Sequence, residues 1–203
     1  MASKTRLGIL GSGRGTNFLA IQNNIIQGKL DAETAIVLSD KKSKILEHAK
    51  HFGLETKFVD PSLFADNRKF DKELIRLLKS AKVELVILAG YMKILSAEFI
   101  NAFPSRIMNI HPSLLPSFKG LNAQRQALEY GVKYSGCTVH FVNSHLDAGP
   151  IILQSVVPVL DTDSVDTLAA RILDEEHKIY TQAIDLYHKK KLRVVHNKVK
   201  VSA

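Results

Sequence analysis

Three polar side chains in the second half of the chain form a set that can catalyse the transfer of an acyl-like group. Asn109 and His111 lie in the segment Met108–Pro116, and Asp147 lies in the turn Leu146–Pro150. A histidine moves protons near neutral pH, an asparagine amide donates a hydrogen bond to a developing oxyanion, and a carboxylate tunes the histidine. No nucleophilic side chain is required for this chemistry.

The spacing of Asn109 and His111 places both side chains on one side of an extended segment, because they are two residues apart. Pro112 and Pro116 follow, so the chain is expected to leave the end of a strand without forming a helix. In open α/β sheets, ligands collect at the carboxyl ends of the strands. Each of the three residues taken alone is also compatible with a capping or turn role. No H-x-x-x-H pattern or acidic ligand cluster accompanies them, so we predict no metal site.

A glycine-rich segment, Gly11–Asn17, follows an apolar run and precedes a predicted helix. A phosphate fits this position, since backbone N–H groups and the start of a helix attract anions. Thr16 stands where the dinucleotide-binding fingerprint has its third glycine, and no Gly-Lys-Ser/Thr triplet follows, so neither an NAD motif nor a nucleotide P-loop is present. A tight turn without any ligand remains the alternative.

Short apolar runs alternate with helical patterns along the first half of the chain, which indicates a parallel sheet. The predicted strands are Thr5–Leu10, Thr34–Leu38, Thr56–Val59 and Glu84–Ala89, and the predicted helices are Asn17–Gln27, Ser43–Phe52 and Asn67–Lys79. In the last of these helices Phe70, Leu74, Leu77 and Leu78 form one apolar stripe, which should cover the sheet.

The second half of the chain predicts three further strands and a long helix. Arg106–Ile110 is followed by two β-branched runs, Gly136–Val142 and Ile151–Val157, which we expect to pair antiparallel at an edge. Ser164–His188 has the spacing of an amphipathic helix that starts at Ser164. The expected fold is therefore α/β, a doubly wound, mostly parallel sheet with helices on both faces and an antiparallel edge.

The composition is that of a globular protein, with 203 residues, 45% of them hydrophobic and 24% charged. Cys137 is the single cysteine, so neither an intramolecular disulfide nor a thiol-rich zinc site can form. We see no signal-peptide pattern at the N-terminus and no apolar run of the roughly 20 residues that a membrane helix needs. We therefore expect a cytoplasmic protein without a membrane partner.

The formal net charge is +8, and much of it comes from the end of the chain. No acidic residue follows Asp185, whereas six basic residues do: Lys189, Lys190, Lys191, Arg193, Lys198 and Lys200. We expect a single domain, residues 1–188, followed by a basic tail, residues 189–203. The tail lacks interleaved aromatic residues, so we expect a solvated terminus and no nucleic-acid partner.

The chain resembles the phosphoribosylglycinamide formyltransferases, folate-dependent enzymes of purine biosynthesis with a Rossmann-like fold, from its first strand to about Tyr187. The matching segments are Gly11–Asn17, Leu88–Leu95, Asn109–Pro116, Leu146–Pro150 and Glu175–Tyr180. The Asn109–Pro116 and Leu146–Pro150 patterns are shared with other formyl-group enzymes. The glycine segment and the short length favour glycinamide ribonucleotide as the acceptor.

This resemblance implies a role for each matching residue. Asn109, His111 and Asp147 would be catalytic. Gly15, Thr16 and Asn17 would hold the phosphate of the acceptor, and Glu176 its ribose hydroxyls. The pocket for 10-formyltetrahydrofolate, a co-substrate, would be lined by Arg68, Met92, Lys93, Ile94, Leu95, Asn109, Asn143, Ser144, His145, Leu146 and Asp147. Lys93 and Asn122 stand where the family often has arginine and histidine, and a lysine keeps the charge but not the fork of donors.

The resemblance implies transfer of the formyl group from 10-formyltetrahydrofolate to the amine of glycinamide ribonucleotide, by direct attack of the amine. Two alternatives remain open at this point. The first is hydrolysis of 10-formyltetrahydrofolate by water, which would use the same Asn, His and Asp without a phosphate site. The second is a basic ligand- or RNA-binding module without turnover. The oligomeric state is not predicted.

Overall fold

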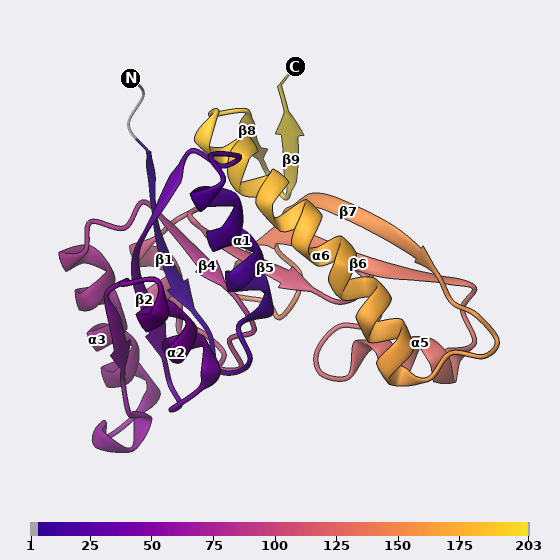
Figure 1. Cartoon of the computed structure of the whole chain (residues 1–203), viewed down its shortest axis with the longest axis horizontal. Helices are drawn as coiled ribbons and strands as arrows, with labels where there is room; N and C mark the ends of the chain where they lie inside the picture. The colour runs from indigo at the N-terminus through magenta and orange to yellow at the C-terminus, as the bar shows by residue number, and fades with distance from the viewer. Residues whose placement is uncertain (1–3, 203) are drawn as a thin grey trace. The chain divides into compact units, whose positions relative to one another are not determined.

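The computed structural model describes residues 4–202, and the chain divides after Met108 into two compact units, which are described one at a time (Figure 1). In hydrogen-bonding order the strands of the main sheet are β3-β2-β1-β4-β5-β6-β7, and β8 and β9 form a separate pair. Residues 1–3, on which part of the signal-peptide prediction rests, and residue 203, the end of the predicted tail, lie outside the described residues.

The first unit alternates strands and helices as the sequence predicts. Its elements are β1 Thr5–Leu10, α1 Thr16–Ile26, β2 Ala32–Ser39, α2 Lys44–His51, β3 Thr56–Phe58, a 3₁₀ turn Pro61–Leu63, α3 Asn67–Ser80, β4 Leu85–Leu88 and α4 Ala97–Ala102. Strand β1 pairs in parallel with both β2 and β4, and β2 pairs in parallel with β3. The predicted parallel sheet is thus confirmed.

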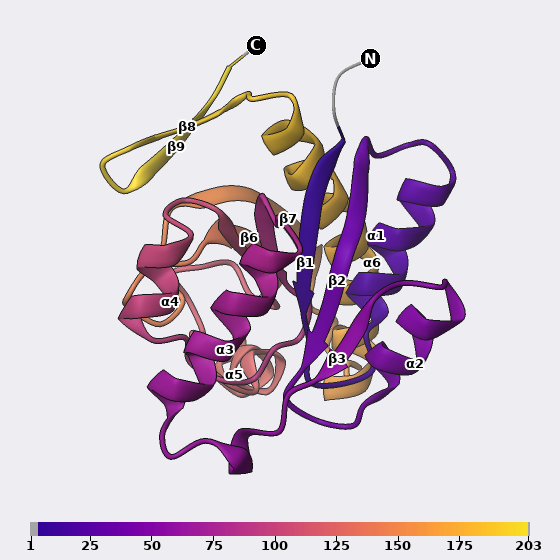
Figure 2. The ribbon, with the colours of Figure 1, turned by 90° about the vertical axis from the view of Figure 1, so that its left-hand side faces the viewer.

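Helices cover both faces of this four-stranded region. Figure 2 shows α3 on one side of β1 and β2, and α1 and α2 on the other. The predicted stripe of α3 is buried, since Phe70, Leu74, Leu77 and Leu78 are at most 8% exposed. Asp66 caps α3 by accepting a hydrogen bond from the backbone N–H of Lys69. This doubly wound arrangement arises because the strands are apolar on both faces, so helices must pack against each face of the sheet.

Strand β5, Ile107–His111, begins at the end of the first unit, and the second unit continues from Asn109. Here α5 Ala123–Tyr130 precedes two strands, β6 Tyr134–Phe141 and β7 Ile151–Pro158, which pair antiparallel as expected. Helix α6, Val165–His188, packs on β6 and β7. It starts after Ser164, which forms a capping box with Thr167.

The basic segment at the end of the chain contains secondary structure that we did not expect. Strands β8 Leu192–Val195 and β9 Lys198–Val201 form an antiparallel hairpin around His196 and Asn197. The alternation of valine with basic residues in Arg193–Val201 is a strand pattern. The helices α4 and α5 were also missed, because each is short and offers fewer than three turns of periodicity. Among residues 4–202, no helix is both long and apolar enough to cross a membrane.

Candidate active site

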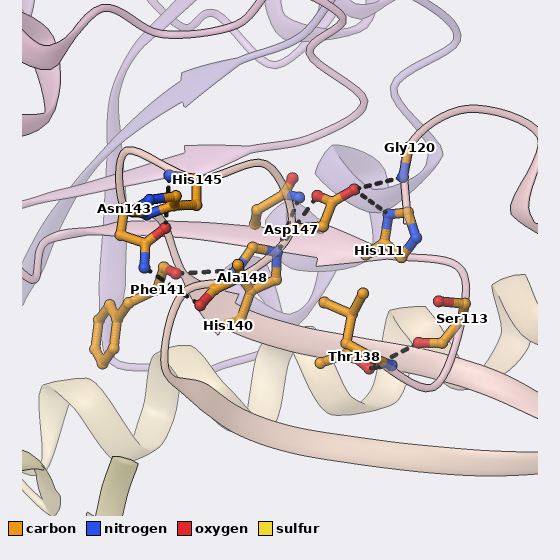
Figure 3. Close-up of polar contacts among 12 residues, drawn as sticks. His111, Ser113, Gly120, Thr138, His140, Phe141, Asn143, His145, Asp147 and Ala148 are labelled. Carbon is orange, nitrogen blue, oxygen red and sulfur yellow. Dashed lines mark hydrogen bonds and ion pairs between the residues drawn. The ribbon is translucent and has the colours of Figure 1, made fainter. Parts of the chain in front are cut away.

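His111 ends β5 and is only 5% exposed. Its Nε2 lies 2.9 Å from the carbonyl oxygen of Phe118. Its Nδ1 lies 3.4 Å from Oδ2 of Asp147 (Figure 3). Both ring nitrogens therefore face an acceptor. A ring that carries a proton on each nitrogen can donate to both, so the surroundings of His111 are suited to holding and releasing a proton.

Asp147 reaches His111 from the turn between β6 and β7, and its side chain is 9% exposed. Its Oδ2 also accepts a hydrogen bond of 2.8 Å from the backbone N–H of Gly120. Its backbone is left-handed, with φ of 47°, a conformation that Asp, Asn and Gly adopt more easily than other residues. The turn thus directs the carboxylate inward, toward the ring of His111 (Figure 3).

The turn that carries Asp147 is held against β6 by close backbone contact. A Cβ on Gly149 would lie 1.8 Å from the carbonyl oxygen of Phe141, so only glycine fits there. The Asn143 side chain accepts from the N–H of His145 and donates to the carbonyl of Ala148, which closes the turn on itself. These local bonds fix the position of the Asp147 carboxylate, which lies 36 residues beyond His111 in the sequence.

Asn109 is oriented by His140, which sequence reasoning set aside because no motif surrounds it. His140 is 2% exposed, and burial lowers the pKa of its imidazole, so the ring is neutral. Its Nδ1–H donates to the carbonyl of Phe141, which leaves Nε2 to accept from the Asn109 amide nitrogen at 3.2 Å. The same Nε2 lies 3.9 Å from Oδ1 of Asp147, so Asn109, His111 and Asp147 converge as predicted.

The segment after His111 is fixed by the hydroxyl of Thr138, which is fully buried on β6. This hydroxyl donates to the carbonyl of Ser113 and accepts from the N–H of Leu115. Gln154 on β7 donates to the same hydroxyl and to the carbonyl of Leu115. The period-two spacing of Thr138 and His140 along β6 is the only signal in the sequence that could have marked either residue.

The glycine segment in the first unit has a backbone shape that depends on Gly15. Gly15 has φ of 76°, and a Cβ there would lie 2.8 Å from Ile45, so no other residue fits without strain. Helix α1 begins at Thr16 without a side-chain cap, and the first N–H groups of a helix have no acceptor within it. Asn17 is 8% exposed and Thr16 is partly exposed.

The residues assigned by resemblance to the folate pocket lie on two parts of the chain. In the first unit, Met92 and Ile94 are exposed, Leu95 is buried, and the Lys93 ammonium lies over the ring of Phe70. The side chain of Arg68 on α3 is 76% exposed and lies 3.9 Å from Glu98. In the second unit, Ser144, His145 and Leu146 are exposed on the turn before Asp147. Glu176, assigned to the acceptor, is 7% exposed on α6.

Among residues 4–202, no group of three or more His, Cys, Asp or Glu side chains is arranged to hold an ion. Cys137 is fully buried, and burial raises the pKa of its thiol to about 12. Such a thiol is a poor nucleophile. The contacts of Asn109 and His111 place an amide donor and an imidazole in the polar cluster, the groups used in oxyanion stabilisation and proton transfer.

Comparison with known proteins places these residues in one family. The profile of the formyl transferase family, "Formyl transferase", matches residues 5–184. Phosphoribosylglycinamide formyltransferase of Escherichia coli (strain K12) is 40% identical over 190 residues, which are 93% of this chain and 90% of that protein. A crystal structure of glycinamide ribonucleotide transformylase 1 from Symbiobacterium toebii superposes with a TM-score of 0.98 and 46% identity, covering 100% of this chain and 96% of that one.

The "Trifunctional purine biosynthetic protein adenosine-3" of Gallus gallus is 42% identical over 185 residues, which are 91% of this chain. The chain spans only 18% of the length of that relative. The family profile covers both compact units, including β1, the glycine segment, the His111 cluster and most of α6. With its family profile matched from β1 to Ile184 within α6, the chain belongs to the formyl transferase family.

Proposed function

We propose that the chain transfers the formyl group of 10-formyltetrahydrofolate to the amine of glycinamide ribonucleotide, as a step of purine biosynthesis. The observation that carries this proposal is the group of Asn109, His111 and Asp147, which comes together in a member of the formyl transferase family. The group supplies a hydrogen-bond donor, a proton carrier and a charge at one place.

The reaction consists of one addition and one elimination. The acceptor amine attacks the formyl carbon and forms a tetrahedral intermediate, whose oxygen carries negative charge. Asn109 has two amide hydrogens, one of which is taken by His140, so the other is free to donate to this oxygen. A proton then passes from the attacking nitrogen to N10 of the folate, the bond between carbon and N10 breaks, and tetrahydrofolate leaves.

His111 and Asp147 act on the protons of this reaction. The protonated imidazole donates to the oxyanion or to the departing nitrogen, and general acid–base groups of this kind contribute about a hundred- to ten-thousand-fold to the rate. Asp147 holds the ring in place through its contact with Nδ1. No step uses a covalent enzyme intermediate or a metal ion.

The phosphate of the acceptor binds at Gly15, Thr16 and Asn17, at the start of α1, since backbone N–H groups and the start of a helix attract anions. Glu176 binds the ribose hydroxyls through its carboxylate. Folate binds against the exposed apolar side chains of Met92 and Ile94, with Leu95, Lys93 and Arg68 contributing from the first unit. The family resemblance also assigns residues 143–147 to folate.

We further propose that the protein acts in the cytoplasm on these small molecules without a nucleic-acid or membrane partner. The basic hairpin β8–β9 then lies outside the reaction, and electrostatic retention of phosphorylated substrates near it would be weak at physiological salt.

The deciding experiment incubates the purified chain with 10-formyltetrahydrofolate, with and without glycinamide ribonucleotide, and follows tetrahydrofolate, formate and formylated acceptor separately. We expect tetrahydrofolate to form only when the acceptor is present, with one formylated acceptor per tetrahydrofolate. Formate release that does not depend on the acceptor would identify a hydrolase. Binding of both ligands without any product would identify a binding protein, and either result would refute the proposal.

A further inference from the structure

Ser12 lies at the start of the glycine segment and makes two hydrogen bonds to a segment almost 80 residues away in the sequence. Its backbone N–H donates to the carbonyl of Gly90 at 3.1 Å, and its hydroxyl accepts from the N–H of Met92 at 3.0 Å. Ser12 is only 7% exposed. Both bonds lie within the first unit, so they are part of one compact body.

The segment that Ser12 holds, residues 90–96, is anchored at its other end as well. The carboxylate of Asp71, which is 3% exposed on α3, accepts a hydrogen bond of 2.7 Å from the N–H of Ser96. Between these two anchors Met92 is 61% exposed and Ile94 is 78% exposed. The backbone of residues 90–96 is thus fixed while two apolar side chains are presented outward.

The two bonds of Ser12 also constrain what the glycine segment can offer to a phosphate. The N–H of Ser12 is already taken by Gly90, and the N–H of Gly11 donates to Leu38. The anion site therefore begins beyond Ser12, at the N–H groups near the start of α1. Ser12 itself faces away from that site, toward Gly90 and Met92.

We propose that Ser12 is a positioning residue that fixes the folate-binding segment 90–95 to the phosphate-binding loop, so that both co-substrates bind to one rigid frame. This inference rests on the proposed function for the identity of the two ligands. The physical basis of the inference does not depend on the proposed function, because removal of the Ser12 hydroxyl leaves the N–H of Met92 without its acceptor. The bond is partly buried, and its loss removes one of the two hydrogen bonds by which Ser12 holds residues 90–92.

The first test needs no ligand. In Ser12→Ala, amide hydrogen exchange at Met92 should be at least about tenfold faster, because its N–H has lost its acceptor. Exchange at Ser96, held by Asp71, should change less than about twofold, since local opening is confined to one cooperative segment. Exchange at Met92 that matches the unmodified protein would overturn the proposal. Ser62→Ala serves as the matched control, because it removes an exposed hydroxyl from a different turn.

The second test uses the reaction. In Ser12→Ala the KM for 10-formyltetrahydrofolate should rise about tenfold, whereas the KM for glycinamide ribonucleotide should rise less than about threefold, because the anion-binding N–H groups remain. A larger change in the KM for glycinamide ribonucleotide than for folate would contradict the positioning role. Failure of the unmodified protein to transfer formyl groups would instead refute the proposed function and leave the exchange test standing.

The third test keeps the proposal falsifiable if Ser12→Ala does not fold. In the unmodified protein, saturating glycinamide ribonucleotide alone should slow amide exchange at Met92 by at least about threefold. Ligand binding at the glycine segment should stabilise the hydrogen bonds between Ser12 and residues 90–92. Calorimetry establishes first that the ribonucleotide binds. Bound ribonucleotide with unchanged exchange at Met92 would show that the two segments are not coupled.

Discussion

The glycine segment 11–17 and the cluster around His111 use opposite means to present polar groups. The glycine segment relies on backbone N–H groups, and its shape depends on the absence of a side chain at Gly15. The cluster relies on side chains, each held by a named bond, such as His111 by Phe118 and Asn109 by His140. A substitution that changes the backbone shape should therefore impair the glycine segment, whereas the removal of single side-chain atoms should impair the cluster around His111.

The largest effect is expected at His111, where one side chain carries the proton. His111→Ala should lower turnover by about a hundred- to ten-thousand-fold, the usual contribution of a general acid–base group. Steady-state kinetics checks this, with calorimetric titration of both substrates to establish that they still bind. Turnover within about threefold of the unmodified protein would remove His111 from the mechanism.

The backbone site is tested by a pair of alanine variants in the glycine segment. Gly15→Ala should destabilise the protein by about 2 kcal/mol, because alanine is strained at positive φ and its Cβ would meet Ile45. It should also raise the KM for the phosphorylated acceptor. Gly13→Ala is the matched control, because a Cβ there has no heavy atom within 4 Å. Chemical denaturation measures the free energy of unfolding of both variants. An equal loss of stability in the two would show that the glycine segment does not depend on the missing side chain at Gly15.

A change of charge without a change of shape is possible at Asp147. Asn tolerates the left-handed backbone at this position, and its carbonyl can still accept from Gly120. Asp147→Asn should lower turnover by at least about tenfold, since hydrogen bonds to charged groups exceed neutral ones by about 1 kcal/mol or more. Stability should change little. Full activity in this variant would reduce Asp147 to a turn residue.

The smallest effect concerns His140 and the dependence of stability on pH. Burial lowers the pKa of His140 in the folded protein, so the unfolded chain binds a proton that the folded protein does not. Stability is therefore complete above the unfolded pKa of about 6.5 and is lost as the pH falls toward the folded pKa. In His140→Gln, which cannot titrate, the free energy of unfolding should fall less steeply below about pH 6.5. A slope equal to that of the unmodified protein would mean that His140 does not contribute.

Much of the fold follows from local sequence. The strand Thr5–Leu10 and the helix Asn67–Lys79 were predicted within one residue of their observed ends, because each has a clear period and a clear boundary. The N-cap of α6 at Ser164 is likewise a local signal. The hairpin β8–β9 was missed because a cluster of basic residues was interpreted by its charge and not by its alternation.

The residue types and local spacing of Asn109, His111 and Asp147 indicated transfer of an acyl-like group from the sequence alone, and the resemblance of their motifs to those of formyl-group enzymes implied that the group is formyl. The sequence could not indicate that His140 orients Asn109, that Phe118 and Gly120 complete the surroundings of His111 and Asp147, or that Ser12 holds Met92. Those contacts join residues that are distant along the chain or use backbone atoms, which any residue type can supply. Only the tertiary structure brings such partners within hydrogen-bonding distance, since burial and strand pairing decide which atoms face each other.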